Sequence, residues 1–381
     1  MAGWLMAQIS DIHFGAQFAR VFADDILRWW SMMLEDWDKL PQPVELAVVT
    51  GDITIAGERD ILAQVKEVFE QAPIPIHPIP GVADVGCEGG KESWVELFGE
   101  TERVVKHKDV RFLFLDLIGR SETNELRWIL TTEQVAWLRE QVQADTRAPL
   151  IAVIHPALEK REGFYTPPWD SNSADQMLQA LAHGNLLAIL TGERHANGEW
   201  LVGNAYVIST GGLCGYRWTN VPPDYCILTR PGYRLIWLED GTLRTFWREV
   251  TSPVQVTISF VGESHTLGPR PQVHVLDIYA DCDILVQACA RDADIESVEI
   301  GLGGSPWIPL QKTWEGPWSE WEGTLHTYEV GWGQQLLVAC ARSTNGDEAY
   351  DAVPFWMRSV SARRASAVRE AIIFELMERP R

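Results

Sequence analysis

Cysteine is scarce in this sequence, long hydrophobic runs are absent, and basic residues are few. The six cysteines are scattered among 381 residues with no Cys-x-x-Cys pair, which excludes a disulfide scaffold and indicates thiols in a reducing compartment. No apolar run reaches the length of a membrane span, because charges, prolines or glycines interrupt each one. The first residues lack the basic region of a secretory signal. We therefore expect a cytoplasmic protein without a membrane segment.

The shortage of basic residues gives the chain a strongly acidic balance. Lys and Arg number 32 against 53 Asp and Glu, so the formal net charge is −21. This surplus repels phosphate backbones and disfavours nucleic-acid binding through bulk charge, although a small basic pocket remains compatible with it. Apolar residues make up 46% of the chain, which is ordinary for a globular protein with a large core.

The pattern of the chain changes near residue 252. Residues 1–250 alternate short apolar runs with helical periods and then close with strands joined by tight turns, which predicts a layered α/β architecture with an antiparallel flank. Residues 253–358 show no helical period. Their short alternating runs, separated by turn signals, predict an all-β sandwich of the immunoglobulin or fibronectin type. Residues 359–381 carry apolar side chains at helical spacing and predict a docking helix.

The predicted sandwich is rich in tryptophan over a short stretch. Trp307, Trp314, Trp318 and Trp321 lie close together in the sequence. Aromatic side chains in exposed β loops bind sugars or protein partners, whereas burial in a core or in a dimer interface is the more common role of tryptophan. We therefore expect core packing for most of them, and the sandwich is a candidate surface for homo- or hetero-oligomers.

Acidic or histidine side chains directly follow four predicted strands. They are Asp11 and His13 after the first strand, Asp52 after the second, His155 after a later apolar strand, and Glu193 and His195 after the next one. Ligands of open α/β sheets bind outside the carboxyl ends of strands, so these positions can converge. Imidazole and carboxylate together suit Mn, Fe or Zn, and a carboxylate such as Asp52 can bridge two ions.

Each of these positions has a plainer explanation when taken alone. An aspartate after a strand is more often a turn or cap residue, and a single histidine is more often a hydrogen-bonded surface residue. The occurrence of four such positions in order, each closing a strand, favours a shared metal site.

The order of these motifs resembles the calcineurin-like metallophosphoesterase family. Its motifs are D-x-H, G-D, G-N-H-D, a single H and G-H-x-H, and the spacing is most similar to the cyclic-nucleotide phosphodiesterase-like subgroup. The helix predicted to start at Thr131 or Thr132, with Gln134 as a capping residue, reads Thr-Glu-Gln-Val-Ala-Trp-Leu and is similar to a helix of that family. The resemblance covers about residues 5–250 and implies a β-sandwich flanked by helices.

The resemblance also implies a set of metal ligands. Asp11, His13, Asp52 and His195 match the ligands of the first ion, Asp52 would bridge to a second ion, and His155 matches a ligand of that second ion. The cofactor implied is one or two divalent or trivalent ions of Mn, Fe or Zn.

Two motifs depart from the family pattern. Gly81-Val82-Ala83-Asp84 stands where the family has Gly-Asn-His-Asp. Val82 cannot coordinate a metal, Ala83 removes the imidazole that protonates the leaving group or steadies the phosphate, and Asp84 is left without the partner it would orient. Glu193 replaces a second-metal histidine, which a carboxylate can do around a hard or borderline cation.

These features predict a metal-dependent phosphoesterase that hydrolyses a phosphomonoester or phosphodiester, such as a nucleotide, with metal-activated water and an impaired second metal site. Arg194 or His77 is a candidate phosphate clamp or acid. A solvated loop charge explains Arg194 equally well, and the apolar neighbours of His77 favour simple packing. The alternative is an inactive protein of this fold that acts as a binding or scaffold module, which the altered Gly-Asn-His-Asp block favours.

Overall fold

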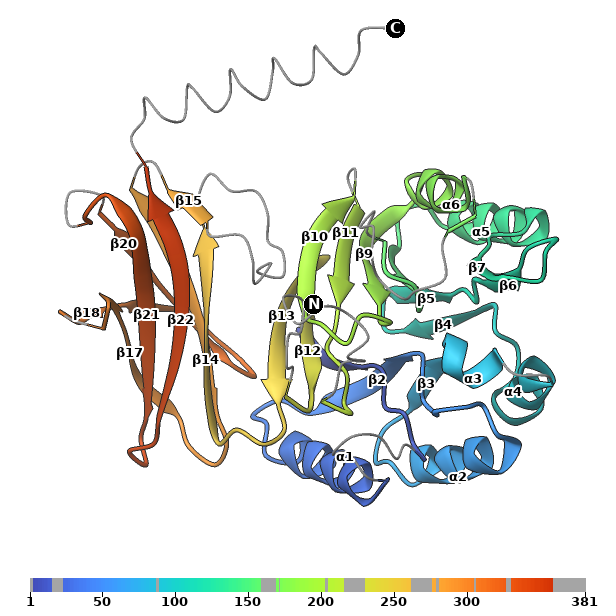
Figure 1. Cartoon of the computed structure of the whole chain (residues 1–381), viewed down its shortest axis with the longest axis horizontal. Coiled ribbons are helices and arrows are strands. Elements are labelled where there is room, and N and C mark those ends of the chain that lie inside the picture. Colours follow the sequence, from blue (N-terminus) through green and yellow to red (C-terminus); the bar gives the residue numbers. More distant parts are fainter. Residues whose placement is uncertain are drawn as a thin grey trace, which may run out of the picture. The chain divides into compact units, whose positions relative to one another are not determined.

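The computed structural model describes most of the chain. The described residues are 3–15, 23–86, 89–158, 169–170, 172–202, 205–215, 230–261, 276–278, 281–304, 306–326 and 330–358. Within these ranges the residues up to Ser252 form one compact unit, and those from Pro253 onward form a second (Figure 1). The helix predicted in residues 359–381 lies outside the described part.

The first unit is built on two mixed sheets. The first sheet has the order β13-β12-β1-β2-β3, and the second has the order β10-β11-β9-β8-β5-β4. The strands of the first are β1 (Trp4–Ile9), β2 (Val44–Thr50), β3 (Ile76–Ile79), β12 (Gly232–Glu239) and β13 (Thr242–Glu249). Those of the second are β4 (Arg103–His107), β5 (Val110–Phe114), β8 (Pro149–Val153), β9 (Asn185–Thr191), β10 (Gly198–Val202) and β11 (Ala205–Ser209).

Parallel strands form the centre of each sheet. In the first sheet β1, β2 and β3 run parallel, and β12 and β13 continue it in antiparallel register. In the second sheet β5, β8, β9 and β11 run parallel, with β4 and β10 antiparallel at the edges. The central strands therefore present their carboxyl ends at one edge of each sheet, where loops can carry functional side chains.

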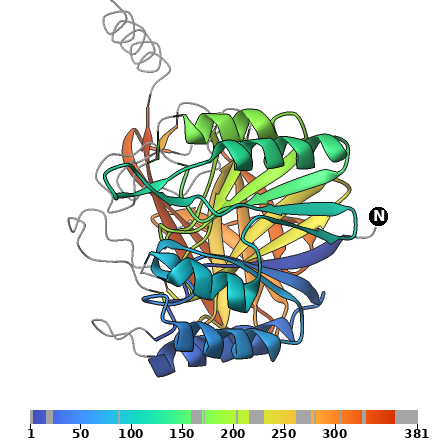
Figure 2. The same cartoon turned by 90° about the vertical axis from the view of Figure 1, so that its right-hand side faces the viewer.

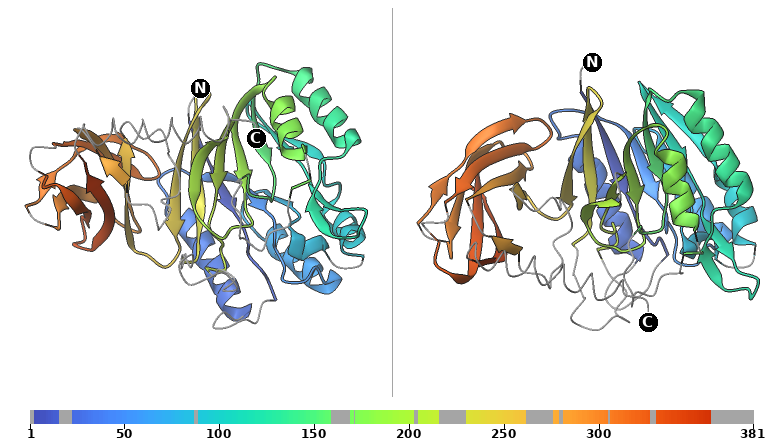
Figure 3. Two further views of the ribbon diagram at one scale, coloured as in Figure 1. Left: turned by 45° about the horizontal axis from the view of Figure 1, so that its top comes forward. Right: turned by 90° about the horizontal axis from the view of Figure 1, so that it is seen from above.

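The two sheets pack face to face, with helices on their outer sides (Figures 2 and 3). The core between them contains Met6, Val48 and Ile236 of the first sheet and Ile151 and Leu190 of the second. The helices are α1 (Ala23–Trp37), α2 (Arg59–Glu70), α3 (Val82–Val85), α4 (Gly90–Phe98), α5 (Thr132–Ala144) and α6 (Ser173–Leu181). The arrangement is the layered α/β architecture expected from the alternating pattern.

The predicted start of α5 is present as a capping box. The Oγ1 atom of Thr131 accepts a hydrogen bond from the backbone N–H of Gln134 at 3.2 Å, and the side chain of Gln134 accepts one from the N–H of Thr131 at 2.9 Å. Short elements carried no clear sequence signal: α3, α4, β4 and the hairpin of β6 (Ile118–Arg120) and β7 (Leu126–Trp128). Of these, α3, β6 and β7 have only three or four residues each, too few for a hydrophobic period to develop.

The second unit is all-β in its described residues and consists of two sheets. One has the order β14-β16-β20-β19 and the other β15-β22-β21-β17-β18. Their strands are β14 (Val254–Val261), β15 (Leu276–Ile278), β16 (Cys282–Ala290), β17 (Ile295–Leu302), β18 (Ile308–Pro309), β19 (Gln311–Glu315), β20 (Ser319–Leu325), β21 (Gly333–Ser343) and β22 (Glu348–Met357). The assignment to an immunoglobulin type stays a prediction.

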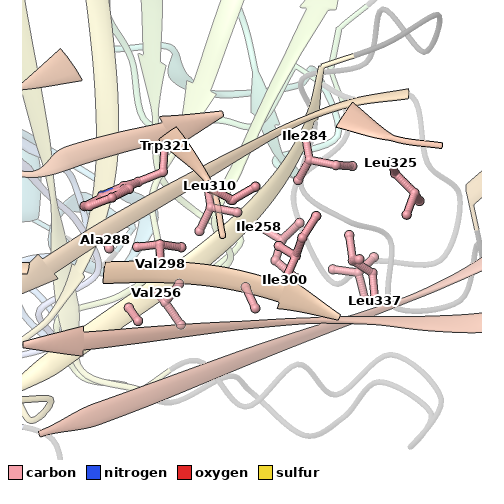
Figure 4. Packing of buried hydrophobic residues seen from close by; sticks show 14 of the residues in the cluster. Val256, Ile258, Ile284, Ala288, Val298, Ile300, Leu310, Trp321, Leu325 and Leu337 are labelled. Carbon is pink, nitrogen blue, oxygen red and sulfur yellow. The ribbon is translucent and has the colours of Figure 1, made fainter. Parts of the chain in front are cut away.

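Apolar side chains from both sheets of this unit form its core. Val256, Ile284, Ile300 and Leu337 pack together there (Figure 4). Trp318 and Trp321 are buried as expected, whereas Trp307 is 37% exposed. Cys289 and Cys340 are free thiols. No helix in the described ranges of the chain is both long and apolar enough to span a membrane.

Candidate metal centre

The six residues predicted as metal ligands lie just beyond the carboxyl ends of four central strands. Asp11 and His13 follow β1, Asp52 follows β2, His155 follows β8, and Glu193 and His195 follow β9. Three of them therefore come from the first sheet and three from the second. The structure brings all six together, because each ligand-bearing loop begins at the same edge of the packed sheets.

Four of these residues form the first half of the cluster. The Nε2 atom of His195 lies 3.1 Å from Oδ1 of Asp11 and 3.1 Å from Nε2 of His13. The Nε2 atom of His13 lies 3.8 Å from Oδ2 of Asp52. All four side chains are buried, so donor atoms on three different loops face a common point away from solvent.

The second half of the cluster is built around His155. Its Nε2 atom lies 2.6 Å from Oε2 of Glu193 and 3.5 Å from Oδ1 of Asp52. Asp52 thus turns one oxygen toward each half. The donor atoms of Asp11, Asp52 and His155 lie within 4.8 Å of one another, which is close enough for a shared ion.

The Nδ1 atoms of His155 and His195 make contacts outside the cluster that hold the two rings in place. The Nδ1 atom of His155 donates to the carbonyl oxygen of Thr50 at 2.6 Å, which directs Nε2 toward Asp52. The Nδ1 atom of His195 lies 3.5 Å from Sγ of Cys214, a buried residue in the loop after β11. Outer contacts of this kind fix the ring orientation of metal-binding histidines. The sequence did not single out Cys214; its only signal is the preceding Gly211-Gly212 pair after a strand.

Five of the six candidate ligands have left-handed backbone conformations. The φ angles are 49° at Asp11, 51° at His13, 50° at Asp52, 67° at Glu193 and 48° at His195. A non-glycine residue in this region costs about 1–3 kcal/mol, and such strain gathers at functional sites where the surrounding structure holds it. The surrounding structure therefore holds these loops in a strained backbone conformation that directs the five side chains into the cluster.

Glycines allow the ligand loops to approach one another closely. A Cβ atom at Gly81 would lie 2.1 Å from Oδ1 of Asp52, and one at Gly192 would lie 2.2 Å from Oγ of Ser10. At Gly51, where φ is 93°, a Cβ atom would lie 2.3 Å from Nδ1 of His155. Any side chain at these positions would displace a candidate ligand or its support.

The electrostatics of the cluster reflect crowded carboxylates. Burial, together with the negative charges of Glu193, Asp84 and Asp11, raises the pKa of Asp52 to about 8 against the opposing effect of His155. Although burial alone would lower it, the carboxylates of Asp52 and Glu193 raise the pKa of His155 well above its usual value. A positive charge at this position would stabilise the crowded carboxylates, and a metal ion would supply that charge.

In the first half of the cluster the pKa values of His13 and Asp11 are lowered rather than raised. Burial and the neighbouring His195 lower the pKa of His13 to about 3, so its imidazole is neutral and keeps an electron pair for a ligand bond. Burial would raise the pKa of Asp11, yet the charge of His195 brings it down to about 2. Against the effect of burial, Asp11 raises the pKa of His195 well above its usual value. His13 is therefore already in the neutral state that binds metals, whereas a metal ion would have to displace the proton of His195.

Three buried polar atoms of the cluster contact other candidate ligands. Oδ1 of Asp11 lies 3.1 Å from Nε2 of His195, and Nε2 of His155 lies 2.6 Å from Oε2 of Glu193. Burying ionisable groups costs free energy unless they are paired or bind a metal, so this crowding requires an explanation. Imidazole nitrogens and carboxylate oxygens aimed at one point fit an ion of Mn, Fe or Zn.

Asp84 in the altered block at residues 81–84 is hydrogen-bonded, although the imidazole that it would orient is absent. Its carboxylate accepts hydrogen bonds from the N–H groups of Gly81 at 2.8 Å, Ile53 at 3.1 Å and Thr54 at 2.8 Å, and from Oγ1 of Thr54 at 2.9 Å. Asp84 thereby ties the start of α3 to the loop that carries Asp52.

The two candidate phosphate groups outside the ligand set are placed differently. Arg194 is half-buried and lies between Glu193 and His195 in the chain, and its contact with a phosphate stays a prediction. His77 lies within β3 rather than beyond its end, paired in register with Val48, and its ring packs against that of Phe114. Its position agrees with packing.

No protein-family model matches the sequence. Among curated proteins, the chain is similar to a "Probable cyclic nucleotide phosphodiesterase" from Psychrobacter arcticus, with 26% identity over 217 residues, which cover 54% of this chain and 76% of the relative. Among solved structures it is similar to the purple acid phosphatase PPD1 from yellow lupin (Lupinus luteus) seeds, with a TM-score of 0.47 and 14% identity over 66% of this chain and 52% of that one. It is also similar to GAP50, described as the anchor in the inner membrane complex of Plasmodium, with a TM-score of 0.45 and 12% identity over 66% of this chain and 86% of that one.

Proposed function

We propose that the chain is a metal-dependent phosphoesterase whose centre holds one ion firmly and a second more weakly. Asp11, His13, Asp52 and His195 would hold the first ion. The observation that carries the proposal is the convergence of buried imidazole nitrogens and carboxylate oxygens around Asp52, whose two oxygens face opposite halves of the cluster.

The second position has fewer and less suitable donors. It would use Asp52, His155 and Glu193, and the asparagine of the resembled motif is replaced by Val82. Oδ1 of Asp52 also accepts a hydrogen bond from the backbone N–H of Ala83 at 2.8 Å. Since that oxygen already has a donor, its bond to a second ion would be weaker.

The residues of the centre divide the work of phosphoester hydrolysis. A bound ion would polarise a phosphoryl oxygen and acidify water, which is the chemistry that Mn, Fe and Zn supply in such sites. Thr50 and Cys214 orient the imidazoles of His155 and His195. Arg194 is the candidate for binding a phosphate oxygen. With alanine at position 83, no imidazole protonates the leaving group, so substrates with good leaving groups are favoured.

The substrate class that we propose is a small phosphodiester or phosphomonoester, including nucleotides. The name of the Psychrobacter arcticus relative supports a phosphodiester. The net charge of −21 agrees with a small substrate held by an ion rather than a polymer held by a basic surface.

The alternative is a binding or scaffold protein without turnover. It is favoured by the loss of both Asn and His at Val82 and Ala83, and by the hydrogen bonds that turn Asp84 into a purely structural group. In that case the cluster would hold a metal for structure, or bind a ligand without cleaving it.

The test compares metal content and hydrolysis in matched variants. The purified protein is loaded with Mn, its metal content is counted, and bis-p-nitrophenyl phosphate and cyclic nucleotides are assayed. We expect Asp52→Asn to lower metal affinity by roughly tenfold or more and to abolish turnover. Asp175→Asn, an exposed aspartate on α6, should leave both unchanged.

Two results would decide against the proposal. Bound metal without turnover on any activated ester would favour the scaffold function. Metal content that is unaffected by Asp52→Asn would show that the cluster is not the binding centre.

A further inference from the structure

The candidate ligands belong to two sheets that share no paired strands in the described part of the chain. Asp11, His13 and Asp52 follow strands of the first sheet, whereas His155, Glu193 and His195 follow strands of the second. Metal sites tolerate displacements of only about 0.5 Å in their ligands. The geometry of the centre therefore depends on how one sheet is registered against the other.

Two buried polar side chains of the first sheet occupy positions that face the second sheet. Gln8 on β1 and Arg234 on β12 are directly opposite each other in the antiparallel pair, and they are 0% and 3% exposed. Met6 and Ile236 lie two residues away on the same strands, and both belong to the core between the sheets. Side chains two apart on a strand share a face, so Gln8 and Arg234 point into that core.

Both side chains donate to main-chain carbonyl groups of the second sheet. Nε2 of Gln8 donates to the carbonyl oxygen of Thr191 at 3.0 Å, and Nη2 of Arg234 donates to that of Ser209 at 3.1 Å. Thr191 and Ser209 are themselves register partners in the β9–β11 pair. Two neighbouring donors on one sheet thus meet two neighbouring acceptors on the other, and we call these four residues the inter-sheet clasp.

The clasp lies immediately behind the ligand loops. Gln8 precedes Asp11 by three residues, and Thr191 precedes Glu193 by two. Nη2 of Arg234 also lies 3.4 Å from Oδ1 of Asn197, two residues beyond His195.

Two further hydrogen bonds join the loop that carries His195 to the end of β11 and to the loop that follows it. Oδ1 of Asn197 accepts the N–H of Gly211 at 2.9 Å, and Oγ of Ser209 donates to the carbonyl oxygen of Ala196 at 3.0 Å. The loop after β9 is thereby joined to the loop that carries Cys214, so the same polar group fixes both.

Additional partners hold the guanidinium group in one orientation. Nη1 of Arg234 donates to Oε1 of Glu199 on β10 at 2.5 Å and to Oγ1 of Thr245 on β13 at 2.8 Å. The carboxylate of Glu199 also accepts hydrogen bonds from the hydroxyl groups of Thr245 and Tyr206. A planar donor group with this many fixed partners acts as a rigid spacer between sheets.

Apolar residues at positions 8 and 234 would avoid the free-energy cost of desolvating polar side chains. Burying an amide and a guanidinium group between two sheets costs desolvation free energy, and replacing buried polar pairs with apolar residues is often neutral or stabilising. We propose that Gln8 and Arg234 are positioning residues, which set the register of the two sheets and hence the distances among the metal ligands. This inference rests on the metal centre of the proposed function.

The experiment compares the clasp with a buried arginine elsewhere in the same hairpin. The variants are Gln8→Leu and Arg234→Met, and the control is Arg248→Met, because Arg248 on β13 is fully buried and binds Asp36 of α1 instead of the second sheet. Mn²⁺ affinity is measured by equilibrium dialysis with metal counting. Hydrogen exchange at the amides of Gly211 and Leu213 is measured in the metal-free proteins, since Leu213 donates to the carbonyl oxygen of Ser10, directly after β1 of the first sheet.

We expect both clasp variants to weaken Mn²⁺ binding by roughly tenfold or more, the effect typical of groups that support metal ligands, and to speed exchange at the two amides. The control should lose stability without changing either property. Arg234→Lys keeps the positive charge but lacks the planar guanidinium group with its several N–H donors. If Arg234→Met fails to fold, Arg234→Lys should fold and should still bind Mn²⁺ more weakly than the unaltered protein.

Equal effects of the clasp variants and the control on Mn²⁺ affinity and on exchange would overturn the inference. If the unaltered protein binds no Mn²⁺, the proposed function fails instead, and the exchange rates alone then decide whether the clasp fixes the two sheets.

Discussion

The backbone N–H of Ala83 donates to Oδ1 of Asp52 over 2.8 Å. The residue that stands in place of an imidazole in the resembled motif therefore still contacts the carboxylate between the two halves of the cluster. Its main chain keeps a supporting role, while its side chain offers no proton. Residues 81–84 therefore contact Asp52 through the main chain of Ala83, whose methyl group has no proton to donate.

This contact predicts the effect of introducing an imidazole at position 83. Ala83 is half-buried, so Ala83→His adds a ring beside Asp52 without removing the N–H contact. We expect turnover of phosphodiesters with poor leaving groups to rise, by at most ~10²–10⁴-fold, because general-acid catalysis has that range. Activated nitrophenyl esters should change little, and steady-state assays of both substrate types measure the difference. Val82→His is the neighbouring control, and an equal gain from it would contradict the role assigned to position 83.

A single methyl group at Gly81 should disrupt the centre without removing any ligand. Its Cβ atom would lie 2.1 Å from Oδ1 and 2.3 Å from the backbone nitrogen of Asp52, so the ligand must move. We expect Gly81→Ala to lower Mn²⁺ affinity by roughly tenfold or more, as measured by dialysis. Gly331→Ala, where only the flexible side chain of Gln335 lies nearby, should bind as before. Unchanged affinity in Gly81→Ala would show that Asp52 does not ligate the ion in this position.

The metal-free protein should become less stable as the pH rises toward 8. The pKa of Asp52 is raised from 3.8 to about 8 in the folded state, so the folded chain keeps a proton that the unfolded chain releases. A raised pKa contributes stability at low pH that is lost as the pH passes through the folded value. The melting temperature in the presence of chelator should therefore fall between about pH 6 and about pH 8.

Two further measurements check that Asp52 causes the fall of the melting temperature with pH. Asp52→Asn carries no titrating proton at this position, so its melting temperature should depend less on pH. The raised pKa values of His155 and His195 act in the same direction as that of Asp52 and leave part of the dependence in place. Addition of Mn²⁺ should also flatten it, because the ion replaces the proton. A melting temperature that rises with pH over this interval would contradict the assignment.

A buried ion pair between α1 and the first sheet should dominate local stability. Asp36 accepts hydrogen bonds from Arg248 at 2.8 and 3.0 Å and from the hydroxyl group of Tyr233 at 2.7 Å. Asp36→Ala leaves the guanidinium group buried and unbalanced, and should lower the free energy of unfolding by about 3–5 kcal/mol. Arg230→Ala breaks an exposed pair with Glu249, in which Arg230 is 68% exposed, and should cost about 0–1 kcal/mol. Urea denaturation compares the two, and similar losses would contradict the prediction.

The strand-end positions of the candidate ligands could be predicted from the sequence because each follows a local signal. Val48-Val49-Thr50 is a buried strand, and Gly51-Asp52 follows at once, so the strand end and its carboxylate are visible together. The layered architecture follows from the same alternation of apolar runs and helical periods. The distances between loops depend on sheet packing, and no local pattern contains them.

Polar contacts between residues far apart in the chain could not be predicted from the sequence either, because they also depend on how the sheets and loops pack. Gln8 sits inside an apolar strand, and its acceptor, Thr191, is far away in the chain. The four donors to Asp84 become apparent only when α3 is placed beside the loop after β2. The left-handed angles at Asp11 and His195 are likewise set by their surroundings, since neither residue follows a turn motif that requires them.

The candidate ligands are split between two distant stretches of the chain, residues 11–52 and 155–195, and β1 pairs in antiparallel register with β12. During synthesis the first stretch leaves the ribosome before the second stretch exists. A centre that uses all six candidate ligands could therefore assemble only after His195 has been synthesised.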